Sequence, residues 1–162
     1  MLKIQKMLGL ALLAALAACG SNGGGPAPVQ DFGAFRASVE EFEALAHTQG
    51  QPGLRVTNLI IKYGPVSSAQ TVAECTHGSN MNPTITVDAV KFGAYGALQQ
   101  RAILFHEMGH CVLDRRHLNT LRQVGAILVP TSYLYAAIAD VDVNLLTDYQ
   151  PTLDRELFNP SE

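Results

Sequence analysis

The sequence predicts an α+β domain in which a small mixed sheet, with an edge strand, packs on a central helix, flanked by an N-terminal and a C-terminal helix. Apolar residues recur at spacings of three and four within 31–47 and 131–149, which indicates two amphipathic helices. Residues 98–113 contain one Gly and no Pro and are rich in helix formers, so they form the central helix. Residues 84–88 alternate apolar and polar side chains, as a half-solvated edge strand does.

The remaining elements follow in order along the chain. A β-rich run at 54–63 comes after Pro52-Gly53 and predicts a strand. Residues 71–73 form a weaker strand candidate, and residues 77–80 favour a turn. Thr131 or Ser132 is available as the N-cap of the last helix.

Length and charge narrow the classes of function. The chain has 162 residues, which suits one domain with short appendages. Without the first eighteen residues, nine Lys and Arg face fourteen Asp and Glu, a net charge of −5 with neutral histidines. Nucleic-acid-binding domains are normally basic, so we expect no nucleic-acid partner.

The N-terminus has the pattern of an export signal. Two lysines within 1–6 precede an apolar run at 7–18, which is too short for a transmembrane helix because twelve helical residues rise only about 18 Å. Leu16-Ala17-Ala18-Cys19 resembles the bacterial lipobox, which implies cleavage before Cys19 and lipidation of its thiol. The alternative is a chance Cys after a signal peptide that is cleaved elsewhere.

A flexible linker follows the lipidated cysteine. Residues 20–28 read GSNGGGPAP, and they contain no large apolar side chain that could be buried in a core. The sequence therefore predicts a signal peptide at 1–18, a lipidated tether at 19–30 and a folded domain at 31–162. Gly20-Ser21 without an Asp resembles the outer-membrane sorting pattern of Gram-negative lipoproteins, which implies a periplasmic or surface location.

The central helix carries His106-Glu107-Met108-Gly109-His110, an HExxH pattern. Residues four apart lie one turn apart on the same helix face, so His106 and His110 can bind one cation. Two neutral imidazoles suit Zn²⁺, and the carboxylate of Glu107 can take a proton from water beside the metal. The pattern predicts a zinc site with Glu107 as general base; the plainer reading is two histidines that pack in an ordinary helix.

A catalytic zinc site usually has three protein ligands, and His117 is the expected third. An unbroken helix would put His117 about 10 Å along the axis from His110, so the helix must stop early. Asp114 tolerates the left-handed conformation that ends helices, and a turn there would bring His117 back. Asp114 itself and His77 are the alternative ligands.

These residues resemble the motif of the metzincin zinc metallopeptidases, HExxHxxGxxH. The resemblance implies His106, His110 and His117 as zinc ligands, Glu107 as the base and a peptide or protein as substrate. It departs from the motif in that Leu113 replaces the glycine and the third His comes one residue late.

Three further expectations come from the same resemblance. Metzincins place a methionine turn beneath the metal, and Leu128 is the apolar residue that could take its place here. Members of this group use a nearby tyrosine to stabilise the transition state, which points to Tyr133 or Tyr135 here, although most tyrosines have no such role. The edge strand at 84–88 would pair with an extended substrate.

The two remaining cysteines are expected to pair. With Cys19 lipidated, Cys75 and Cys111 are left in an oxidising compartment, where a disulfide would join the loop beside the edge strand to the central helix. Two free buried thiols are the alternative.

Together these patterns predict a membrane-anchored zinc peptidase that acts through a Glu-activated water. Two other functions remain open. One is a non-catalytic lipoprotein that uses a zincin-like fold as a binding module. The other is a zinc hydrolase whose substrate is a cell-wall peptide amide.

Overall fold

Four strands form the mixed sheet of this protein, whose computed structural model describes residues 27–159. The strand order is β1 (Gln30–Asp31), β2 (Leu59–Tyr63), β4 (Met81–Val87) and β3 (Ala73–Gly78). β1, β2 and β4 run parallel, and β3 pairs antiparallel with β4 at one edge.

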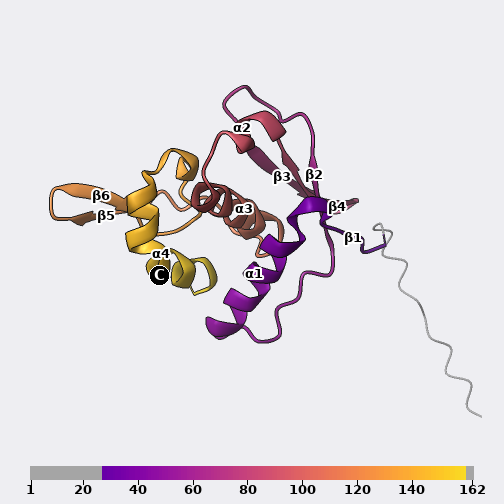
Figure 1. Cartoon of the computed structure of the whole chain (residues 1–162). Coiled ribbons are helices and arrows are strands. Elements are labelled where there is room, and N and C mark those ends of the chain that lie inside the picture. The colour runs from indigo at the N-terminus through magenta and orange to yellow at the C-terminus, as the bar shows by residue number, and fades with distance from the viewer. Residues whose placement is uncertain (1–26, 160–162) are drawn as a thin grey trace, which may run out of the picture.

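Helices and a hairpin complete the domain (Figure 1). The other elements are η1 (Gly33–Phe35), α1 (Arg36–Thr48), α2 (Ala89–Gly93), α3 (Ala97–Cys111), β5 (Leu121–Val124), β6 (Ile127–Pro130), η2 (Ile138–Asp140) and α4 (Val143–Phe158). α3 packs between the sheet, α1 and α4, and the β5–β6 hairpin projects away from the body.

Aromatic contacts join the helices into one core. Phe42 of α1 is fully buried and lies edge-on to Phe105 of α3, with ring centroids 5.4 Å apart. Phe42 also packs on Phe158 of α4 at 5.0 Å. Such pairs add about 0.5–1.5 kcal/mol each to the burial of apolar area. Helices α1 and α4, which begin 107 residues apart in the chain, therefore meet in the core beside α3.

The predicted α+β class is confirmed, including a mixed sheet whose edge strand packs on the central helix. The edge strand, however, is not the predicted one. Residues 84–87 belong to β4, which is covered on both sides by β2 and β3. The true edge strand is β3. It begins at Ala73, the last residue of the weak strand candidate at 71–73, and continues through Cys75 to Gly78, inside the segment predicted as a turn.

The C-terminal helix also begins later than predicted. α4 starts at Val143, where the Asp142 carboxylate accepts a hydrogen bond from Asn144 N–H. Residues 131–142 instead form turns and η2. Tertiary hydrogen bonds account for the difference, since the Leu134 carbonyl accepts from Leu118 N–H and the Tyr133 carbonyl faces His106.

The predicted signal peptide, Cys19 and most of the tether lie outside the described residues. Within residues 27–159, no helix has the length and apolar character needed to cross a membrane.

Candidate metal centre

α3 presents the first two histidines and the glutamate of the site. His106 and Glu107 are buried, with 5% and 7% of their surface exposed. His110 follows one turn later, and its Nε2 lies 3.0 Å from Nε2 of His106. The predicted convergence of the two imidazoles is therefore present.

A turn at Asp114 brings the third histidine to the same point. α3 ends at Cys111, and Asp114 adopts a left-handed φ of 52°. The chain then folds back, with Arg115 N–H donating to the Gly109 carbonyl at 3.1 Å. Nε2 of His117 consequently lies 3.2 Å from Nε2 of His106.

His106, His110 and His117 form a group that could hold a metal ion. One ligand atom from each lies within 4.8 Å of the others. The alternative ligands Asp114 and His77 are not part of this group, although both line the cavity beside it. His117 is therefore the third member, as expected.

Backbone carbonyls set the orientation of two of the rings. Nδ1 of His106 lies 2.7 Å from the carbonyl oxygen of Tyr133, and Nδ1 of His110 lies 2.5 Å from that of Arg115. A carbonyl only accepts, so in both rings the proton is on Nδ1 and the lone pair is on Nε2. Two lone pairs then face each other at 3.0 Å without a proton between them. A shared cation resolves that repulsion, and this donor set fits Zn²⁺.

Burial keeps these imidazoles neutral. Desolvation, with smaller contributions from the neighbouring imidazoles, lowers the pKa of His106 to about 4. The pKa of His110 is lowered for the same main reason. A metal ligand must be deprotonated, so both rings are ready to bind at neutral pH.

Glu107 follows His106 on α3 and lines the same cavity as the three histidines. Burial raises the pKa of its carboxyl to about 8, and the nearby charge of Glu74 acts in the same direction. The backbone N–H of Cys75 donates a hydrogen bond to this carboxylate, which opposes the shift. Without a bound cation, the Glu107 carboxyl therefore keeps its proton to a higher pH than an exposed glutamate does.

A cavity of about 810 Å³ opens over the three histidines. Its walls come from the free side of β3, from α3, from the turn at 114–117 and from residues 136–140. Tyr95 also lines it, a residue that no sequence motif marked. The volume is large enough for several residues of an extended peptide.

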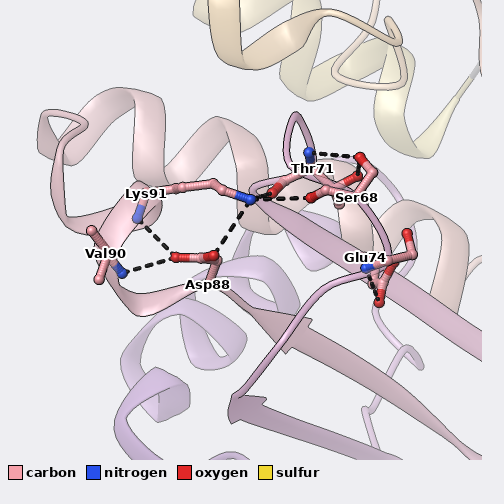
Figure 2. A network of polar contacts seen from close by, with 7 residues as sticks. Ser68, Thr71, Glu74, Asp88, Val90 and Lys91 are labelled. Atoms are coloured by element: carbon pink, nitrogen blue, oxygen red, sulfur yellow. Dashed lines mark hydrogen bonds and ion pairs between the residues drawn. The ribbon is translucent and has the colours of Figure 1, made fainter.

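One wall of the cavity is a loop held in place by Lys91 (Figure 2). The Lys91 ammonium donates to the carbonyls of Ser68 and Thr71, at 3.1 and 2.8 Å. Asp88 caps α2 and forms an ion pair with Lys91 at 3.4 Å. The hydrogen bond from Lys91 N–H is the main cause that lowers the pKa of Asp88. The loop is thereby tied to α2.

The residue that packs against Gly109 of α3 is Leu134, and the expectation for Leu128 is wrong. Leu128 lies in β6 of the projecting hairpin and is 60% exposed. A Cβ on Gly109 would lie only 2.6 Å from Leu134 Cδ2. The glycine of the HExxH pattern is therefore needed for close packing of this layer.

Tyr133 has a different role from the one expected of its hydroxyl. It is 1% exposed, and the hydroxyl donates to Asp154 at 3.0 Å and contacts Arg101. The side chain anchors the segment whose carbonyl orients His106. Tyr135 is not among the residues that line the cavity.

The disulfide between Cys75 and Cys111 is present, with Cα atoms 5.7 Å apart. It joins β3 to the last residue of α3. The predicted pairing is confirmed, and Cys111 directly follows His110 in the chain.

Comparisons with known proteins add no family assignment. No protein-family model, no curated protein and no solved structure matches the chain. Function must therefore be argued from the site itself.

Proposed function

We propose that this chain is a zinc-dependent peptidase in which Glu107 is the general base. The observation that carries the proposal is the pair of Nδ1-protonated histidines whose Nε2 lone pairs face each other, joined by His117, beside a buried carboxyl and an open cavity. A purely structural zinc site would normally be closed by a fourth protein ligand. The open cavity favours hydrolysis.

His106, His110 and His117 would hold the ion. When bound, zinc supplies Lewis acidity and lowers the pKa of a coordinated water. Glu107 accepts a proton as water attacks the substrate carbonyl and returns it to the leaving amine.

The free edge of β3 supports a peptide as the substrate. β3 lines the cavity, and its outer side pairs with no other strand among the described residues. An extended peptide can add to such an edge through main-chain hydrogen bonds. This assigns to β3 the substrate-pairing role that was expected for residues 84–88.

We further propose that the domain is tethered to a bacterial outer membrane through lipidated Cys19 and acts on the periplasmic or surface side. Support comes from the N-terminal sequence pattern alone. Globomycin inhibition of the lipoprotein signal peptidase should leave an unprocessed precursor, and unchanged processing would contradict the lipidation.

Metal analysis and peptide hydrolysis test the proposed activity. The purified protein should bind one zinc and cleave members of a quenched fluorescent peptide library. Glu107→Gln should keep the zinc and lose at least about 100-fold in turnover, the usual scale of general-base catalysis. Glu40→Gln, on the exposed face of α1, is the matched control and should change neither.

The outcome also separates the two remaining functions. Zinc without turnover on any peptide would favour a binding module. Turnover confined to cell-wall muropeptides would assign the cell-wall amide substrate. Absence of bound metal in the native protein would overturn the proposal.

A further inference from the structure

The backbone of Cys75 faces the active cavity because of its register in β3. In an antiparallel pair, hydrogen-bonded residues alternate along each strand. The Val72 carbonyl accepts from Asp88 N–H at 2.9 Å, so Glu74, two residues on, also points its backbone groups toward β4. The amide of Cys75 lies between these positions and is directed to the free edge.

That free amide binds the proposed catalytic base. The Cys75 N–H acts as a hydrogen-bond donor toward the Glu107 carboxyl and lowers its pKa, whereas burial, with only 7% of Glu107 exposed, and the charge of Glu74 raise it. A buried carboxylate that lacks a donor is costly, so the position of this amide influences where the carboxylate lies.

The side chain of the same residue connects β3 to the helix that carries Glu107. Cys75 is bonded to Cys111, four residues after Glu107 on α3. In addition to the packing of β3 on α3, Cys75 thus connects the two elements through its sulfur and through its amide. On its other side β3 pairs with β4, and the register of that pairing shifts between Thr76 and Gly78.

The metal-binding group does not use this connection. The Nδ1 partners of His106 and His110 are the carbonyls of Tyr133 and Arg115, and neither belongs to β3. Movement of β3 would therefore change the surroundings of Glu107 without breaking the two carbonyl contacts that orient His106 and His110.

We propose that Cys75 is a positioning residue for Glu107, and that the disulfide makes turnover, but not metal binding, depend on the oxidised state of the cysteine pair. The inference rests on the proposed peptidase function. It implies that the protein is catalytically weak while its thiols are reduced and becomes competent once the disulfide has formed.

Reduction provides the first test. A water-soluble phosphine breaks the S–S bond and is oxidised to its oxide by the oxygen of one water, whose two hydrogens appear on the two thiols. After removal of the phosphine, kcat should be about 10- to 100-fold lower, the cost of misplacing a catalytic group by roughly 1 Å. KM and zinc affinity should change less than about threefold, and reoxidation should restore kcat.

The double variant Cys75→Ser/Cys111→Ser supplies the matched control. It should show the lowered kcat without reductant and should not respond to the phosphine. Full kcat in the reduced protein or in the folded double variant would overturn the inference. So would a loss of zinc affinity parallel to the loss of kcat, because the disulfide would then serve the metal site.

Amide hydrogen exchange tests the contact without relying on activity. In the oxidised full chain, Glu107→Ala should speed exchange of the Cys75 amide at least about tenfold, the equivalent of one lost hydrogen bond. The next outward-facing amide, that of Ala73, should not change. Unchanged exchange at Cys75 would overturn the inference even if the wild-type protein hydrolysed no peptide, a result that would separately end the peptidase proposal.

Discussion

The carbonyl of Tyr133 accepts the Nδ1 proton of His106 across 2.7 Å, although 27 residues separate the two in the chain. The Tyr133 ring is buried on Phe105, and its hydroxyl is held by Asp154 and Arg101. Arg101 also pairs with Glu41 of α1. The orientation of His106, a proposed metal ligand, thus depends on a polar network that reaches α1 and α4.

Removal of the Tyr133 hydroxyl should weaken the metal site without removing a ligand. Tyr133→Phe leaves the buried Asp154 carboxylate with one donor fewer, which should cost about 1–3 kcal/mol of stability. Loss of support for His106 should lower zinc affinity about 10-fold or more. Chelator competition and thermal unfolding measure the two effects.

The control is Tyr63→Phe, which changes the same group on a residue that is 51% exposed. It should alter neither quantity. If Tyr133→Phe bound zinc as tightly as the wild type, the network would have no role in orienting His106.

The turn at Asp114 should tolerate glycine and resist a β-branched residue. Asp114 has φ 52°, where Gly is unstrained and Val is strained by roughly 1–2 kcal/mol. Asp114→Gly should therefore keep the zinc affinity, whereas Asp114→Val should lower it about tenfold or more by displacing His117. Competition with a chromophoric chelator measures both.

The same pair of variants tests the alternative ligand. If the Asp114 carboxylate were a ligand, Asp114→Gly would lose affinity as well. Equal losses in the two variants would therefore reassign the third position.

Gly109→Ala should destabilise the protein despite the better helix propensity of alanine. The added Cβ would meet Leu134 Cδ2 at 2.6 Å and Leu157 Cδ1 at 3.2 Å. Overpacking costs about 1–3 kcal/mol, which exceeds the roughly 1 kcal/mol gained by replacing a helical glycine. Denaturant unfolding should show a net loss.

Gly93→Ala is the matched substitution, because nothing lies within 4 Å of its Cβ position. It should be neutral or stabilising. In Gly109→Ala/Leu134→Ala the two effects should not add, since the second change removes the clash. Simple additivity would show that the clash is not the cause.

The metal-free protein should lose stability as the pH rises from about 6.5 to 8. Burial raises the pKa of Glu107 to about 8, so the folded state holds a proton that the unfolded state has lost above its ordinary pKa of 4.5. His106, whose pKa falls to about 4, acts in the opposite sense. Below about pH 6.5 the lowered pKa values of His106 and His110 oppose the decline in stability, and above it only the Glu107 contribution remains.

The expected decline is about 2 kcal/mol over those 1.5 pH units. Urea unfolding of chelator-treated protein at several pH values measures it. Glu107→Gln cannot ionise and should remove the decline, and an identical decline in that variant would assign the effect to another group.

Local sequence patterns were sufficient for the parts of the protein in which residues close in the chain act together. The i, i+4 spacing placed His106 and His110 on one face of α3, and the tolerance of Asp114 for positive φ predicted the turn that returns His117. The amphipathic spacing located α1, and the short list of cysteines predicted the disulfide. The predictions for the histidines, the turn and α1 rest on backbone geometry within a few residues. The prediction of the disulfide rests on the elimination of Cys19 as a partner.

Contacts between distant segments decided the rest. Residues 84–87 alternate like an edge strand, yet they are interior because β3 pairs on their far side, which alternation within one strand cannot reveal. Helical spacing predicted a helix from residue 131, but the carbonyls of Tyr133 and Leu134 are engaged by His106 and Leu118. A segment whose backbone groups bond to other elements cannot also satisfy them within a helix, and only the assembled fold shows which bonds form.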